Sequence, residues 1–143
     1  MCQPTLPTSH EGCFNDSRAT IVYEDGHKFI ENSKENFDVI VIDITCPRVE
    51  SSAHKLFTKE FRLAVLNKLK PHGLIAVQAS TTSPSINSFS IICNTIINSV
   101  FPKVFPYAAY VPSFSMLWGY CLATRGLSPF NILMTILTKG FLK

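Results

Sequence analysis

The sequence predicts an α/β domain with a mostly parallel sheet, and three observations support this class. Short apolar, β-branched runs alternate with segments in which apolar residues recur at helical spacing. One of these runs, Phe37–Thr45, is nearly continuous in Val and Ile, which is typical of a strand covered on both faces. The chain has 143 residues, 46% of them hydrophobic and 16% charged, so it can bury the core that a layered domain requires.

The first predicted elements come in the order strand, helix, strand. Ala19–Tyr23 is a short β-branched run that predicts a strand, and the Asp25-Gly26 pair after it is a turn signal. His27–Asn32 is long enough for one or two helical turns, and the Phe37–Thr45 strand follows it.

A longer helix is predicted over Lys55–Lys70, and a strand over Leu74–Ala79. Pro71 and Gly73 end the helical segment, because neither residue continues a helix well. The predicted buried face of this helix consists of Phe57, Phe61, Ala64, Val65 and Leu69.

A second amphipathic helix is predicted over Ser85–Val100. Two final strands, Val104–Val111 and Leu117–Thr124, are joined by the Pro112–Ser115 connection. The predicted buried face of the second helix consists of Ile86, Phe89, Ile92, Ile96 and Val100.

Three segments are predicted: an irregular leading segment over 1–18, the domain over 19–126, and an apolar C-terminal tail over 127–143. We expect the tail to form a terminal helix or a flap covered by a partner. Its apolar part, Pro129–Leu142, is shorter than the roughly 20 residues that span a bilayer, so no membrane association is expected. The first residues lack the basic start and apolar run of a secretory signal.

Charge and cysteine usage exclude further classes. The net charge is +3 without a basic run, which argues against a nucleic-acid partner. The five cysteines are scattered, odd in number and form no CxxC pair, so no metal site is predicted. Free thiols in a reducing, cytoplasmic environment are the expected state.

Five collinear motifs carry a family resemblance that covers roughly residues 11–125. They read FNDSRATIVYEDGHKF (14–29), FDVIVIDITCP (37–47), HKLFTKEF (54–61), LKPHGLIAVQA (69–79) and VFPKVFPYAAYVPSFSMLWGYCLAT (100–124). In this order and spacing they resemble the polyamine aminopropyltransferases, the family of spermidine synthase and thermospermine synthase. The last motif, with VPSF followed by WG, is more similar to thermospermine synthase.

The resemblance implies a Rossmann-like fold of the class I methyltransferase type, truncated at its N-terminus. The glycine-rich turn and the small β-domain of the family have no counterpart in this sequence, so we expect the chain to correspond to the C-terminal portion. The implied reaction transfers an aminopropyl group from decarboxylated S-adenosylmethionine, a co-substrate, to a polyamine such as putrescine or spermidine. No other cofactor is implied.

The catalytic residue implied by the resemblance is Asp43, as the base that removes a proton from the attacking amine. An ammonium has no lone pair, so the reaction needs a carboxylate within hydrogen-bonding reach of the amine. Asp43 follows the Phe37–Thr45 run, at the strand end where open α/β sheets place their ligands. The alternative is an Asp that caps the turn before Pro47.

The resemblance also assigns binding residues. Asp25 and Gly26 correspond to the pair that contacts the adenine of the co-substrate, and Pro47 belongs to the same site; an ordinary β-turn is the alternative for the Asp-Gly pair. Substrate binding is assigned to Cys46, Gln78 and Phe114.

The sequence departs from the family pattern at several positions. Cys46 stands where the family has a second Asp, and a thiol with a pKa near about 8.5 is mostly uncharged at neutral pH. Losing one charged hydrogen bond in a pocket costs about 1.5 to 3 kcal/mol. Glu50–Ala53 replaces a Gly-Pro-Ala turn, and Phe114 replaces a Tyr.

Three hypotheses follow from these observations. The first is an active aminopropyltransferase. The second is a non-catalytic family relative or gene fragment that acts as an interaction partner, in a homo- or hetero-oligomer. The third is a methyltransferase of another substrate class, since a fold alone does not decide function.

Overall fold

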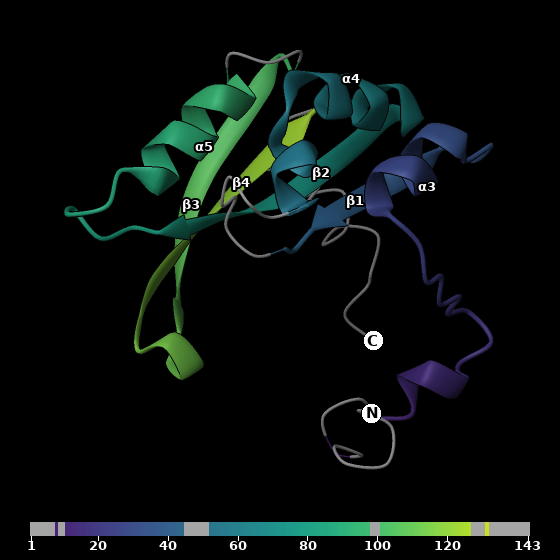
Figure 1. Ribbon diagram of the computed structural model, residues 1–143, viewed down its shortest axis with the longest axis horizontal. Coiled ribbons are helices and arrows are strands. Elements are labelled where there is room, and N and C mark those ends of the chain that lie inside the picture. Colours follow the sequence, from purple (N-terminus) through teal and green to yellow (C-terminus); the bar gives the residue numbers. More distant parts are fainter. Residues whose placement is uncertain (1–7, 9–10, 45–51, 98–100, 127–130, 132–143) are drawn as a thin grey trace.

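The computed structural model describes residue 8, residues 11–44, 52–97 and 101–126, and residue 131. Within these ranges helices and strands alternate up to β3, which a short turn of helix joins to β4, the last described strand (Figure 1). The elements are η1 (Cys13–Asn15), α3 (Gly26–Asn32), β1 (Phe37–Ile42), η2 (Ser52–Phe57), α4 (Lys59–Lys68), β2 (Leu69–Thr81), α5 (Ser88–Ile97), β3 (Lys103–Val111), η3 (Pro112–Phe114) and β4 (Met116–Thr124).

The four strands form one sheet in the order β1-β2-β4-β3. β1 and β2 are parallel, whereas β4 is antiparallel to both β2 and β3. The predicted α/β class is confirmed, but the described sheet is mixed rather than mostly parallel. The reason is the short connection through η3, because a tight connection joins adjacent strands only when they are antiparallel.

The helices α3, α4 and α5 lie on one side of this sheet (Figure 1). The strand residues that face them alternate along each strand, as the two-residue period of a strand requires. Ile75 and Val77 on β2 are register partners of Ala123 and Cys121 on β4, and each of the four is at most 4% exposed. This alternation places the hydrophobic core between the helices and one face of the sheet.

The other face of the sheet is less covered than predicted. Val39 and Val41 of β1 are 51% and 67% exposed, although the continuous Val/Ile run predicts burial on both faces. Within the described residues, only the face that carries Ile40 and Ile42 packs against helices. The expectation of a strand covered on both faces is therefore wrong for this part of the chain.

The predicted strand over Ala19–Tyr23 is also wrong. These residues form neither helix nor strand, and Tyr23 is 93% exposed. A strand requires a hydrogen-bonding partner, and none of the four described strands lies next to this segment in the sheet order. The Asp25-Gly26 pair after it, which predicts a turn, instead forms the start of helix α3.

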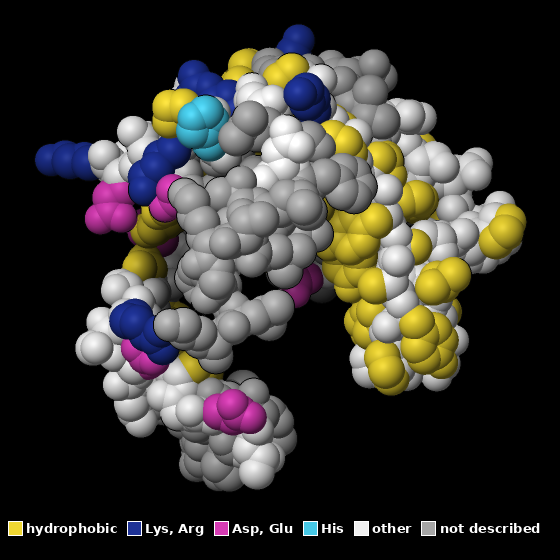
Figure 2. Space-filling view, turned by 180° about the vertical axis from the view of Figure 1, so that it is seen from behind, with side chains coloured by type: hydrophobic (Ala, Val, Ile, Leu, Met, Phe, Trp, Pro, Cys, Tyr) yellow, Lys and Arg dark blue, Asp and Glu magenta, His cyan; other side chains and the backbone are white. Residues whose placement is uncertain are grey.

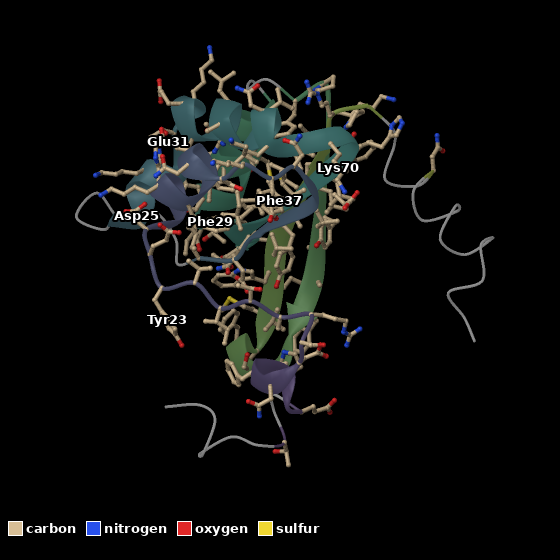
Figure 3. All side chains as sticks on the ribbon, turned by 90° about the vertical axis from the view of Figure 1, so that its right-hand side faces the viewer. Tyr23, Asp25, Phe29, Glu31, Phe37 and Lys70 are labelled. Carbon is tan, nitrogen blue, oxygen red and sulfur yellow. The ribbon has the colours of Figure 1, made fainter. Side chains whose placement is uncertain are left out.

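The predicted helix at 27–32 is confirmed by α3. Aromatic contacts attach it to its neighbours: the Phe29 and Phe37 rings are 6.3 Å apart between centroids, and the His27 and Phe61 rings stack at 5.3 Å. Figure 3 shows Phe29 and Phe37 at the junction of α3 and β1. These contacts connect α3 to the first strand and to α4.

The two longer helices are confirmed with shifted boundaries. The predicted helix at 55–70 is divided at Thr58, whose hydroxyl caps α4 by accepting a hydrogen bond from the Phe61 N–H (3.2 Å). The other helix begins at Ser88 because a turn precedes it, so Ile86, predicted to be buried, is 48% exposed. Its predicted end, Val100, lies outside the described residues. The buried faces are confirmed at Phe61, Val65, Leu69, Ile92 and Ile96, each at most 5% exposed.

The predicted boundaries between the three segments, after residues 18 and 126, stay predictions. Among the residues that the structure describes, no helix is long and apolar enough to span a membrane.

A glycine in β4 sets how closely α5 approaches the sheet. A Cβ atom at Gly119 would lie 2.2 Å from Cδ2 and 2.5 Å from Cε2 of Phe89. The Phe89 ring therefore occupies the space that a side chain at position 119 would need.

We expect Gly119→Ala to lower the free energy of unfolding by about 1–3 kcal/mol, because a methyl group added to a packed contact forces the ring and helix to shift. Urea unfolding of Gly119→Ala in the wild-type and Phe89→Leu backgrounds measures this effect. A smaller side chain at position 89 leaves room for the methyl group, so the cost should fall in that background. An equal cost in both backgrounds would contradict the contact as its cause.

Candidate active site

Asp43 lies directly after β1, at the carboxyl end of the parallel β1–β2 pair. Its side chain is exposed. The carboxyl ends of adjacent parallel strands are where open α/β sheets bind ligands. Asp43 therefore lies where such a sheet binds a ligand, and its catalytic role stays a prediction.

Gln78 of β2 connects Asp43 to β4. Gln78 satisfies both of its neighbours when its amide oxygen accepts from the Trp118 Nε1–H (3.1 Å) and its nitrogen donates to an Asp43 carboxylate oxygen. The three residues come from three different chain segments and form one hydrogen-bonded line, which we call the Asp43–Gln78–Trp118 group. Because Trp118 fixes the Gln78 amide and Gln78 bonds to Asp43, the Asp43 carboxylate has a defined orientation.

The pairing of Gln78 with Tyr120 places Trp118 on the same face of the sheet as Gln78, and an irregularity in β2 follows directly after Gln78. Gln78 pairs with Tyr120 and Thr81 pairs with Trp118, so three steps along β2 match two along β4. This extra residue is a β-bulge, a feature that re-aims side chains near functional sites. Within it, Ser80 is 5% exposed and has a φ of 76°, in the left-handed region that favours glycine.

The chain after the bulge is fastened to the start of β4. The Thr82 N–H and hydroxyl both donate to the Leu117 carbonyl, at 3.4 and 3.2 Å. The Thr81 hydroxyl donates to the sulfur of Met116 (3.4 Å) and accepts from the Ser83 N–H (3.1 Å). These bonds fix the strand segment that leads into Trp118.

Aromatic rings extend the site along β3 and β4. The rings of Phe114 and Trp118 are 4.7 Å apart, and those of Tyr107 and Tyr120 stack at 5.2 Å. Tyr120 pairs with Gln78 across the strands, so this stack lies on the same sheet face as the Asp43–Gln78–Trp118 group. Burial, together with the neighbouring Tyr120 and Cys121, raises the pKa of Tyr107, so its hydroxyl remains a neutral hydrogen-bonding group.

These rings belong to a wider apolar surface. Figure 2 shows hydrophobic side chains gathered over the β3–β4 hairpin, where Phe114 is 47% and Tyr107 is 43% exposed. The site is thus a carboxylate beside an accessible aromatic and apolar wall.

Comparisons with known proteins identify the family. Residues 1–130 match the family model described as the spermine/spermidine synthase domain. The chain belongs to this synthase family.

Similar proteins include two named polyamine aminopropyltransferases. The protein from Sulfurisphaera tokodaii is 42% identical over 120 residues, which cover 84% of this chain and 39% of the relative. The protein from Sulfolobus acidocaldarius is 35% identical over 123 residues, covering 86% and 40%. The chain thus spans about two fifths of the length of these relatives.

Two solved structures have the same fold. The spermidine synthase from Thermotoga maritima matches with a TM-score of 0.75 and 31% identity, covering 90% of this chain and 42% of that one. A spermidine synthase in complex with the transition-state analogue AdoDATO matches with a TM-score of 0.79 and 31% identity, covering 90% and 43%. The Rossmann-like fold expected from the resemblance is therefore confirmed.

Asp25 of this synthase-family chain caps α3. Its carboxylate accepts hydrogen bonds from the backbone N–H groups of His27 (2.8 Å) and Lys28 (3.3 Å). The bonds from Lys28 and His27 lower the pKa of Asp25, and the charges of Lys55 and His27 add to this effect. Asp25 therefore remains ionised near neutral pH. Figure 3 shows it beside α3, exposed to solvent.

The structure describes the surroundings of Gly26 but not those of Cys46 or Pro47. A Cβ at Gly26 would meet no atom of the described residues within 4 Å, so on their side its backbone is open to a close approach. Cys46 and Pro47 lie outside the described residues, and their roles remain predictions. The structure brings Asp43 and Gln78 together, whereas Asp25 and Gly26 lie at the start of α3 and Phe114 lies at the hairpin tip.

Sequence reasoning missed two features of the site. Neither Trp118 nor Tyr107 is among the predicted site residues, but in the structure Trp118 donates to Gln78 and Tyr107 stacks on Tyr120. The alternation of Trp118 and Tyr120 along the predicted strand was the available signal. Across the described residues, no group of three or more His, Cys, Asp or Glu side chains is arranged to hold a metal ion.

We expect Ser80→Gly to unfold at higher urea concentration than Ser80→Ala. Both variants remove the hydroxyl, but only glycine adopts a φ of 76° without the steric cost of about 1–2 kcal/mol that a Cβ imposes. The difference between the two midpoints, converted with a common slope, measures the strain at this bulge. An alanine variant as stable as the glycine variant would show that the backbone is unstrained.

Proposed function

We propose that the chain is the catalytic portion of a polyamine aminopropyltransferase. The reaction moves an aminopropyl group from decarboxylated S-adenosylmethionine to a polyamine such as putrescine or spermidine. The observation that carries the proposal is the Asp43–Gln78–Trp118 group at the carboxyl end of β1 and β2, in a chain of the spermine/spermidine synthase domain family. A solved relative at 31% identity is a spermidine synthase bound to a transition-state analogue.

The reaction is a substitution at carbon. The nitrogen lone pair of a neutral amine forms a bond to the methylene beside the sulfonium, while the carbon–sulfur bond breaks and its electrons remain on sulfur. Methylthioadenosine leaves, and the surplus proton of the amine passes to the Asp43 carboxylate. A base in this role typically accelerates a reaction by about a hundred- to ten-thousand-fold.

Gln78 and Trp118 position this base. The amide of Gln78 donates to one carboxylate oxygen of Asp43, which leaves the other oxygen to face the amine. Trp118 holds the Gln78 amide in the orientation that makes this donation. Preorganised hydrogen bonds of this kind cost no reorganisation during the reaction.

The aromatic residues can bind the part of the polyamine that does not react. Its methylene chain is apolar and its remaining ammonium groups are cationic, and aromatic faces bind both. Phe114, Tyr107 and Tyr120 supply such faces beside Gln78. We assign Cys46 to this pocket in place of the family's second carboxylate, with correspondingly weaker binding of an ammonium.

Two finer assignments belong to the same proposal. A thermospermine synthase type of acceptor specificity is supported by the VPSF and WG motifs at 111–114 and 118–119. A cytoplasmic location is supported by the scattered cysteines, since a reducing compartment keeps such thiols free.

Titration of the full chain with methylthioadenosine tests the proposal directly. Because Trp118 is the only tryptophan, its fluorescence reports on the site while isothermal titration measures the heat of binding. We expect binding at about micromolar strength, some 8 kcal/mol, with a change in emission. A folded chain that binds no nucleoside would overturn the active-enzyme interpretation and favour an interaction partner.

We expect Asp43→Asn to lower the rate of aminopropyl transfer roughly a hundred-fold or more while methylthioadenosine binding stays within about twofold, because the amide cannot accept the proton. Product formation from decarboxylated S-adenosylmethionine and spermidine is the measurement. Asp38→Asn is the matched control, since Asp38 is an exposed carboxylate on the same strand that pairs with Lys70 (2.7 Å). Equal losses in both variants would argue against Asp43 as the base.

The two interpretations of Asp25 are separated by Asp25→Asn and Asp25→Ala. Asparagine is as good a helix cap as aspartate, so Asp25→Asn should keep the thermal stability that Asp25→Ala loses. If the carboxylate also accepts from the adenine amine, both variants should bind methylthioadenosine about ten- to a hundred-fold more weakly. Unchanged binding in the asparagine variant would leave Asp25 as a cap alone.

A further inference from the structure

We propose that Cys93 and Cys121 form an intramolecular disulfide, a modification site that fastens α5 to β4. Their sulfur atoms are 2.7 Å apart, although the residues are 28 positions apart in the chain. Cys93 is 4% and Cys121 is 0% exposed, so the contact is internal to the fold. No movement of whole elements is needed to bring the two sulfurs together.

The packing of α5 explains why these cysteines meet. Phe89 and Cys93 are four residues apart and share one helical face, whereas Gly119 and Cys121 are two apart and share one face of β4. Phe89 packs against Gly119, and Cys93 packs against Cys121. The glycine permits the close approach at the first contact, and the helix period then brings Cys93 onto Cys121 at the second.

A buried cation lies near the pair. Arg62 of α4 is 4% exposed, and its Nη1 atom has no hydrogen-bond partner among the described residues. Its positive charge favours the thiolate of Cys121, but burial is the stronger effect and raises the pKa of both thiols. Since the thiolate is the reactive form, exchange in the folded chain is slow.

The oxidant is a small-molecule disulfide of the glutathione class, and it reacts with the cysteines before they are buried by folding or when the chain unfolds locally. One cysteine thiolate attacks the oxidant, forms a mixed disulfide and releases one glutathione thiolate. The other cysteine thiolate then attacks the bound cysteine sulfur and releases the second glutathione. Two cysteine thiols are oxidised, one glutathione disulfide is reduced to two thiols, and the two cysteine protons end on those thiols.

The bond would stabilise the element that carries Trp118. Cys121 lies three residues after Trp118 on β4, and α5 contacts β2, β3 and β4. A covalent link between α5 and β4 also restricts the unfolded chain. In a reducing cytosol the pair stays as thiols, and a rise in oxidised glutathione converts it to the more stable form.

Refolding of the full chain in buffers of defined reduced and oxidised glutathione tests this proposal. Free thiols are then alkylated, and the protein is digested without reduction and mapped by mass spectrometry. We expect a fragment that links Cys93 to Cys121, lighter by two hydrogen atoms than its separate parts, and a melting temperature higher by about 10 °C than in the reduced chain.

Two variants keep the test decisive. Cys13 is exposed, and replacing Cys2, Cys13 and Cys46 together by serine leaves only the proposed pair, so the triple variant should show the same linkage and the same shift. Cys93→Ala should show neither. If Cys93→Ala does not fold, the triple variant carries the test. Alkylation of both cysteines after refolding in excess oxidised glutathione, or their linkage to other cysteines, would overturn the proposal.

Discussion

The pairing of β2 with two neighbours is the interaction on which the rest of the structure depends. β2 bonds to β1 in parallel and to β4 in antiparallel orientation, and this double pairing brings Asp43 and Trp118 to opposite sides of Gln78. The bulge at Ser80 shifts the register of β2 against β4 by one residue directly after Gln78. The site is therefore a consequence of sheet register rather than of any single loop.

One face of the sheet forms the hydrophobic core, and the other carries the candidate site. The face under α3, α4 and α5 is packed, and its buried residues supply most of the hydrophobic stabilisation. The other face carries Gln78, Tyr120 and the exposed Val41. The contact of Phe89 with Gly119 links the two faces. It packs α5 against one side of β4, and Trp118 projects from the other side of the same strand.

Much of this arrangement could be predicted from the chain. The helical spacing of Phe61 and Val65 indicated a buried face, and the motifs around Asp43 and Gln78 indicated the edge of the sheet at which we propose the reaction occurs. The strand expected at Ala19–Tyr23 failed for a physical reason: β propensity describes how a residue fits a sheet, but a ladder also requires a partner strand. The Cys93–Cys121 contact had no local signal, because neither cysteine belongs to a short-range pair.

The sequence by itself determined the α/β class, the family and the identity of the proposed base, because periodicity and collinear motifs are local properties of the chain. Only the tertiary structure decided which residues meet Asp43. The hydrogen bond from Trp118, the stack of Tyr107 on Tyr120 and the contact of Cys93 with Cys121 join residues that lie far apart in sequence or depend on register. A shift of one residue in a strand moves every side chain to the other face, and register is set by the whole sheet rather than by any one strand.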